Sequence, residues 1–427
     1  MTAFCSEAYG SVHRAISRIA QTVDLTHPVW ISMNVYSFCQ QRLDMADPNA
    51  SVAAVCDDVD SVLGSAGPTA WYAFSPQSAA ALGVWSNVTY PSSLVRQHIP
   101  DDAVFGDSSF TSNNVVYDIV ANFNADFAWW FPKNDDTDAG YADFINGFMG
   151  KLGRSSVPLY TSGDQPVSSA SVTSYYDMEQ TLVHEFIHGL GFTSSWYPYL
   201  TLSGSIRSAA IKALMFPSDF LRNEGGCIVG MGLPYVTDRG WALAESGIWL
   251  NGYAERIRAG IDETVVALKA STGTSQLEDA AWTDDVFVSQ FATTDGYQAA
   301  LNLATRIKTQ AIVSWYPTAP SLFVTPNDMP TTSMSAAEQV DFETSWAAAV
   351  MYTPQKLQPG SSFSHFDNQY YEGSSEFMMR PYGTQGVGLD GFMSADTRYG
   401  PIGRATLGVL TMMGYATALG PVVASLA

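Results

Sequence analysis

The residues best suited to chemistry are His184, Glu185 and His188, in the segment HEFIH. On a helix, side chains four residues apart share one face, so both imidazoles can bind the same ion. Glu185 then lies beside that ion, where it can take a proton from a metal-bound water molecule. Zinc suits the task, because it keeps an open coordination position and lowers the pKa of bound water to about 7. A chain of this composition contains the pattern by chance roughly 0.002 times, so we expect one zinc ion per chain.

The flanking residues predict the helix that positions this motif. It should begin near Ser174, where Ser174 and Asp177 resemble a capping box with Asp in place of Glu, and it should end at Gly191. The alternative is an ordinary core helix. Its two histidines and its glutamate would then need buried polar partners among four apolar neighbours: Leu182, Val183, Phe186 and Ile187.

A catalytic zinc is expected to have three protein ligands, so a third must come from elsewhere. Ser194 occupies the position of a short-spaced third ligand and is a poor one. The remaining histidines are His13, His27, His98 and His365, of which the first three have surface or loop surroundings. Glu224 or Glu245 is a rival, as in enzymes that use a glutamate on a second helix.

His365 lies in SHFD, and EFMM follows at residues 376–379. Together with HEFIHGLGF, these segments resemble the leishmanolysin branch of the metzincin zinc peptidases, over roughly residues 115–195 and 361–416. The resemblance implies that His184, His188 and His365 bind zinc and that Glu185 is the general base. It also implies that Met378 is the Met-turn residue beneath the metal. The spacing from His365 is slightly long, which leaves Met379 as the alternative.

Polar side chains near the third histidine are weaker candidates. A tyrosine hydroxyl can donate a hydrogen bond to a developing oxyanion, and aromatic packing is the plain alternative for each of Tyr370, Tyr371 and Tyr382. Asp367 either orients a ligand imidazole or caps a loop.

The predicted fold is α+β with two lobes. The first lobe, residues 1–192, should hold a twisted sheet and the motif helix. Its predicted elements are a helix over 8–23 and strands over 30–38, 70–74 and 114–130, the last with a polar break at Asn122. The second lobe, 193–427, should supply His365 and the Met-turn. It should also contain a large, mostly helical insertion over 197–360, with predicted helices over 253–270, 296–313, 335–351 and 402–413.

Composition limits the possible partners. The chain has 427 residues and a formal net charge of −21, which repels nucleic-acid backbones and anionic membranes. We find no membrane-spanning segment and no visible signal peptide. The four cysteines, none in a CxxC pair, are Cys5, Cys39, Cys56 and Cys227. The first three can form one or two disulfides in an oxidising compartment, or remain free thiols.

These features predict a zinc-dependent endopeptidase that acts on peptides or proteins. A cleft between the lobes would hold zinc, and an extended substrate would add as a strand to the sheet edge, along 115–124. The resemblance further implies a secreted or extracellular protein. Two alternatives remain: a non-peptidase zinc hydrolase, and a catalytically idle zinc-binding or storage protein.

Overall fold

Helices and strands both contribute to the structure, a computed structural model, which is therefore of the predicted α+β class. Within the described residues, no helix is long and apolar enough to cross a membrane. The structure describes residues 2–46, 56, 62–99, 117–131, 175–196, 214–274, 276–278, 280–307, 309, 311–317, 346–354, 357–358, 360–389 and 399–419.

A three-stranded sheet packs against the helix that carries HEFIH. Its strands are ordered β2 (Ile31–Tyr36), β6 (Ile119–Asn124) and β3 (Gly64–Pro68). β2 runs parallel to β6, and β3 runs antiparallel to it. Since β6 has a partner on each side, the prediction that a peptide adds along 115–124 is wrong. Among the described strands of this sheet, the outer edges belong to β2 and β3.

The strand predicted over 114–130 is interrupted. β6 ends at Asn124, and β7 (Ala128–Trp130) begins after a turn. The Asn124 side chain accepts a hydrogen bond from the backbone N–H of Asp126 at 3.0 Å, which closes that turn. The polar break therefore follows Asn124 and does not fall at Asn122.

The motif helix, α8 (Met178–Gly189), begins later than predicted. Residues Tyr175–Asp177 form β8, which pairs in parallel with β7 and so cannot join the helix. Asp177 is the N-cap, because its carboxylate accepts the N–H groups of Glu179 and Gln180 at 2.8 and 3.2 Å. Ser174 lies outside the described residues.

The N-terminal helix holds α8 in place. α1 (Thr2–Ala20) starts earlier than the predicted 8–23 and packs along α8. Arg14 and Arg18 donate through Nε to the Glu179 carboxylate at 2.7 and 2.5 Å. Glu179 is only 1% exposed, and the two guanidinium groups offset the cost of burying its charge.

Short elements complete the N-terminal part. They are β1 (Val23–Asp24), α2 (Phe38–Met45), β4 (Trp71–Ala73), α4 (Pro76–Leu82), β5 (Thr89–Pro91) and α5 (Ser92–His98). β1 pairs with β14 (Ala416–Thr417), so the beginning and the end of the described chain are joined. A disulfide links Cys39 with Cys56, whereas Cys227 is a buried free thiol.

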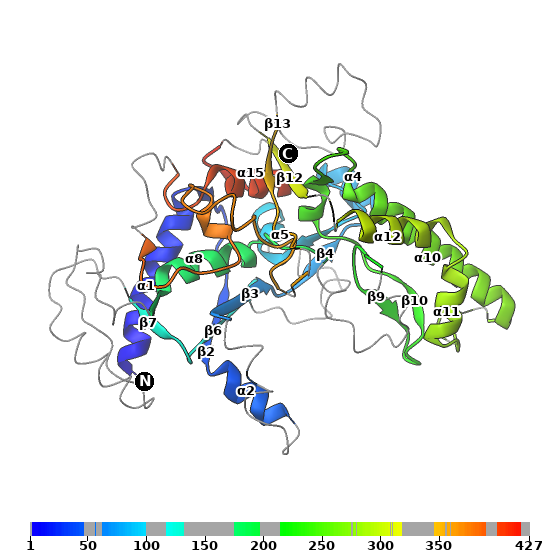
Figure 1. The fold of residues 1–427 in the computed structure, drawn as a ribbon, viewed down its shortest axis with the longest axis horizontal. Helices are drawn as coiled ribbons and strands as arrows, with labels where there is room; N and C mark the ends of the chain where they lie inside the picture. Colours follow the sequence, from blue (N-terminus) through cyan, green and yellow to red (C-terminus); the bar gives the residue numbers. More distant parts are fainter. Residues whose placement is uncertain are drawn as a thin grey trace.

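The following part contains more strand than predicted. Its elements are β9 (Phe220–Arg222), β10 (Ile228–Met231), the 3-10 helix η3 (Val236–Gly240), β11 (Trp241–Leu243), α10 (Leu250–Thr272), α11 (Asp284–Phe291), α12 (Asp295–Arg306), β12 (Ile312–Pro317) and β13 (Trp346–Val350). β12 lies between β11 and β13 in an antiparallel sheet. Helices α10, α11 and α12 gather at one end of the fold, away from α8 (Figure 1).

Two of the predicted helices end in this sheet. The helix predicted over 296–313 stops at Arg306, and its last residues belong to β12. The helix predicted over 335–351 is wrong over 346–350, which form β13, while its predicted start lies outside the described residues. Its alanines favour helix intrinsically, but pairing with β12, as in Ala349 opposite Ser314, overrides that preference. The last helix, α15 (Arg404–Met413), ends at Gly414 as predicted.

Gly191 allows the sharp turn after α8. Its φ is 104°, and an added Cβ would lie 2.6 Å from both Met413 Cε and Pro91 Cγ. We predict that Gly191→Ala destabilises the protein by roughly 3 kcal/mol, the sum of a left-handed backbone and an overpacked contact. Gly83 has a φ of 66° with open space around it, so Gly83→Ala should cost only about 1 kcal/mol. Denaturant unfolding measures both, and equal costs would contradict the steric argument.

Candidate metal centre

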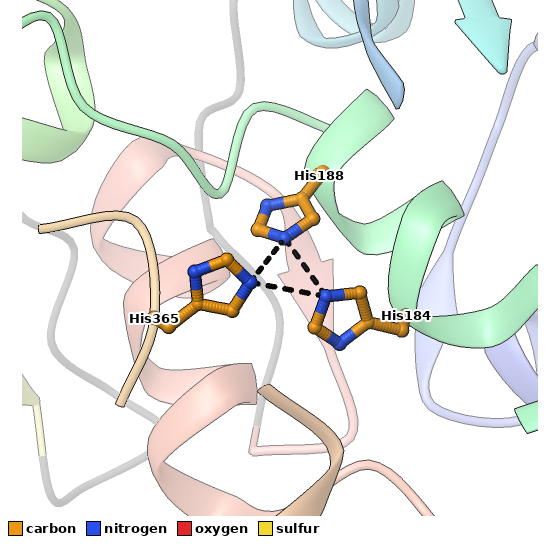
Figure 2. Close-up of side chains that lie close together, drawn as sticks. All are labelled: His184, His188 and His365. Atoms are coloured by element: carbon orange, nitrogen blue, oxygen red, sulfur yellow. Dashed lines mark hydrogen bonds between the residues drawn. The ribbon is translucent and has the colours of Figure 1, made fainter. Parts of the chain in front are cut away.

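Three histidines from distant parts of the chain converge on one point. His184 and His188 extend from adjacent turns of α8, and His365 extends from the segment after β13 (Figure 2). Each pair of their Nε2 atoms is 3.1 Å apart. Of the histidine, cysteine and acidic side chains in the described residues, these three histidines form a group that could hold a metal ion. The structure thus brings together the three residues predicted as ligands.

The outer nitrogen of each ring contacts a backbone carbonyl. His184 Nδ1 lies 2.6 Å from Met378 O, His188 Nδ1 lies 2.6 Å from Phe192 O, and His365 Nδ1 lies 2.9 Å from Ser361 O. Because a carbonyl can only accept, each Nδ1 must carry the proton and donate it. Each Nε2 is then an unprotonated acceptor, as an imidazole ligand requires.

The three short contacts between the Nε2 atoms are therefore not hydrogen bonds. Three lone pairs point at one another in a buried position, which is unfavourable unless a cation lies between them. Two nitrogens that each lie 2.0–2.1 Å from a tetrahedral zinc are roughly 3.3 Å apart, close to the spacing here. The donor set and its geometry consequently fit a zinc ion.

Burial keeps the three rings neutral. Loss of solvation lowers the pKa of His184 to about 4 and that of His188 to about 3, and neighbouring His184 contributes to the second shift. The pKa of His365 is also lowered well below its ordinary value, by burial and then by the two other histidines. Neutral imidazole is the form that binds metal, so no proton must leave these rings near pH 7.

Glu185 lies against strand β3. The side chain is 5% exposed, and the backbone N–H of Ala66 donates to its carboxylate. Burial raises the pKa of Glu185 to about 8, which the bond from Ala66 opposes. An added Cβ on Gly64 would lie 3.2 Å from both Cγ and Oε1 of Glu185. The small residues of β3 therefore leave the space that this carboxylate occupies.

The loop after α8 is held by a carboxylate that no sequence motif marks. Asp238 in η3 accepts hydrogen bonds from Ser194 Oγ at 2.8 Å and from Ser195 Oγ and N at 2.5 and 3.0 Å. Burial raises the pKa of Asp238 to about 7. Ser194, at the position of a short-spaced third ligand, thus anchors the loop. Asp238 is 44 residues away with no motif around it, so only the fold reveals the pairing.

The end of α8 is supported in the same way. Ser93 Oγ donates to Gly189 O at 3.1 Å, Tyr415 OH to Leu190 O at 2.9 Å, and Thr237 Oγ1 to Gly191 O at 2.7 Å. These bonds satisfy carbonyl groups that a helix end leaves without partners. The sequence reasoning missed all three donors, because isolated hydroxyl groups carry no spacing signal.

The EFMM segment supports His184 and His365. Its last three residues form the buried 3-10 helix η4 (Phe377–Met379). The carbonyl of Met378 contacts His184, and the carbonyl of Met379 accepts the N–H of Phe366 at 2.8 Å. Glu376 accepts the N–H groups of Ala405 and Thr406 at 2.7 and 3.2 Å and so caps α15.

The tyrosine candidates occupy different settings. Tyr370 is 72% exposed. The hydroxyl of Tyr371 accepts the N–H of Val350 at 2.9 Å, which gives this residue a structural contact. Tyr382 contacts the hydroxyl of Tyr352 at 2.8 Å, and the backbone N–H of Tyr352 donates to His365 O at 2.8 Å. Tyr382 is therefore connected to the third histidine through Tyr352, while Tyr371 packs against Phe366, the residue after that histidine, with ring centroids 5.5 Å apart.

The rival ligands do not reach the site. Glu224 and Glu245 are exposed, as are His13 and His27. His98 is partly buried and lies 2.8 Å from Gly414 O through its Nε2. Asp367 caps a loop, because its Oδ1 accepts the N–H groups of Gln369 and Tyr370, while Ser361 orients the His365 ring.

A family described as SPBPB7E8-like matches residues 287–424, about a third of the chain. The matched span includes His365 and Met378 but not the helix with His184 and His188, and the description states no activity. No curated protein and no solved structure matches the chain.

We predict that His365→Ala weakens zinc binding by more than about a hundredfold, because a direct ligand should exceed the 10- to 100-fold effect of an outer partner. Glu245→Gln is the matched control and should leave affinity unchanged. Competition with a chromophoric chelator measures both. Equal affinity of His365→Ala and the unaltered protein would remove His365 from the site.

The lowered histidine pKa values predict an unusual pH dependence. Zinc affinity should stay nearly constant from pH 7 down to about 5 and fall only below about 4, because protons compete once the folded rings can hold them. The same competition titration at a series of pH values tests this. A decline centred near 6.5, the ordinary histidine value, would contradict the buried, neutral arrangement.

Proposed function

We propose that the protein is a zinc-dependent endopeptidase of the metzincin type, similar to the leishmanolysin branch. The observation that carries this proposal is the convergence of three unprotonated Nε2 atoms beside a buried glutamate. An idle zinc-binding protein needs the three imidazoles but has no use for a glutamate held one residue from the first of them.

The residues divide the chemistry between them. His184, His188 and His365 would hold the ion. Bound there, zinc supplies Lewis-acid polarisation of a carbonyl group and makes water acidic near neutral pH. Glu185 accepts the proton of the attacking water and returns it to the departing amine. A pKa raised by burial suits a group that must both take and give a proton near pH 7.

The outer edge of β3 offers a place for an extended substrate. Leu63 O and Thr69 N bond to residues of the β6 segment, so by alternation the backbone groups of Gly64, Ala66 and Pro68 face away from β6. The N–H of Ala66 donates to Glu185. The N–H of Gly64 and the carbonyl groups of Gly64, Ala66 and Pro68 remain to pair with a peptide. Peptide or protein substrates that pair along this edge would pass close to Glu185.

Three further features support the proposed family and its two-lobed arrangement, with lobes of 1–192 and 193–427. The third histidine comes from a distant segment, a buried Met378 carbonyl orients His184, and the helix α15 follows both. The disulfide between Cys39 and Cys56 suits the oxidising environment that we propose for a secreted protein.

We predict that Glu185→Gln retains zinc but loses at least about a hundredfold in peptidase activity, because the amide keeps the shape and cannot take the proton. Glu224→Gln, an exposed change of the same kind, is the control and should keep full activity. Digestion of a broad peptide library by zinc-loaded protein, read by mass spectrometry, provides the assay. Undiminished cleavage by the Glu185 variant would refute the mechanism. Absence of cleavage by the unaltered, zinc-loaded protein would favour an idle or non-peptidase centre.

A further inference from the structure

A hollow lies between α10 and α12. Figure 1 shows these two helices at the end of the fold away from α8. Its volume is about 620 Å³, within the usual range for small-molecule sites. The lining residues are Ile248, Gly252, Tyr253, Arg256, Gln298, Ala299, Leu301, Asn302, Thr305 and Arg306. None of them belongs to the metal centre, so this inference is independent of the proposed peptidase activity.

A close helix crossing sets the walls of the hollow. Gly260 of α10 and Gly296 of α12 meet so tightly that an added Cβ on either would lie less than 3.0 Å from the other's backbone. The hollow then opens between residues before Gly260 and residues after Gly296, which means that the two helices run antiparallel. Because the crossing leaves no room for adjustment, the hollow is a fixed feature of this helix pair.

The charge of the lining is opposite to that of the chain. The sequence has 41 acidic and 20 basic residues, yet the hollow contains Arg256 and Arg306 and no aspartate or glutamate. Within the described part of the chain, neither arginine has an ion-pair partner, and Arg306 makes one long contact, 3.5 Å from Ser246 Oγ. Two unneutralised guanidinium groups in one concave surface attract an anion.

The neutral polar groups also favour an anion. Tyr253 OH donates to Asn302 Oδ1 at 2.9 Å, so the carbonyl side of this amide is occupied and its NH₂ group remains to donate. Together with the two guanidinium groups, this makes the hollow rich in donors. Ile248 and Leu301 add exposed apolar surface at its rim, where a carbon skeleton can make contact.

We propose that this hollow binds a small organic anion that carries carboxylate or phosphate groups. Arg256 and Arg306 would bind the oxyanion groups through their planar forks, and Asn302 would add a directed hydrogen bond. The volume exceeds what a single oxyanion fills, so the ligand has a larger body beside its charged group.

Isothermal titration calorimetry of the full chain at low ionic strength tests the proposal, with citrate and inorganic pyrophosphate as probes. At least one probe should bind, and Arg256→Gln and Arg306→Gln should each weaken it about tenfold or more, since a charge-assisted hydrogen bond is lost. Arg258→Gln, on the same helix but outside the lining, is the matched control and should bind like the unaltered chain. Tighter binding of citrate would indicate a carboxylate ligand, and tighter binding of pyrophosphate would indicate a phosphate ligand.

Three outcomes would overturn the proposal. They are no binding of either probe at millimolar concentration, binding that both lining variants retain, and an equal loss in Arg258→Gln. Thermal melting of each variant without a probe checks that a loss of binding is not a loss of fold. Arg256 is exposed, and Arg306 is half-buried with a single long contact to Ser246 among the described residues, so the variants should melt like the unaltered protein.

Discussion

The arrangement of the protein depends on one constraint. Each of the three imidazole rings must donate a hydrogen bond from its Nδ1–H group to a backbone carbonyl. The acceptors are Met378, Phe192 and Ser361, which lie in three separate segments. Once these bonds form, the orientation of each ring is fixed and the three Nε2 atoms point toward one another. The resulting cluster of lone pairs is costly without a cation, which is why we propose that these three rings bind a metal ion.

Buried carboxylates maintain that geometry by accepting hydrogen bonds from the segments around the three histidines. Asp177 caps the start of α8 and also accepts the N–H of Leu389 at 2.6 Å, and Glu179 ties the same helix to α1. Asp238 anchors the loop that supplies the Phe192 carbonyl, and Glu376 caps the closing helix beside the segment that supplies the Met378 carbonyl. Each carboxylate holds a neighbour of one of the three histidines, and none of them belongs to the histidine cluster.

The sequence was sufficient where the signal is local. The spacing of His184 and His188 and the turn at Gly191 depend on residues within one or two helical turns. The sequence was insufficient where a local structure depends on pairing with a segment far away in the chain. The alanines of β13 form a strand because they pair with β12. Tyr175 belongs to strand β8, and not to the helix, because β8 pairs with β7. His365 was reached through a family resemblance rather than spacing, since 177 residues separate it from His188.

The central claim is that the three Nε2 atoms surround a zinc ion. Crystals of the zinc-loaded protein, measured at the zinc absorption edge, test it most directly through the anomalous difference density. The account predicts one strong peak, about 2.0–2.1 Å from the Nε2 atoms of His184, His188 and His365, with Glu185 beside it and not bound. An absent peak, or a peak held by other side chains while these three rings turn away, would contradict it.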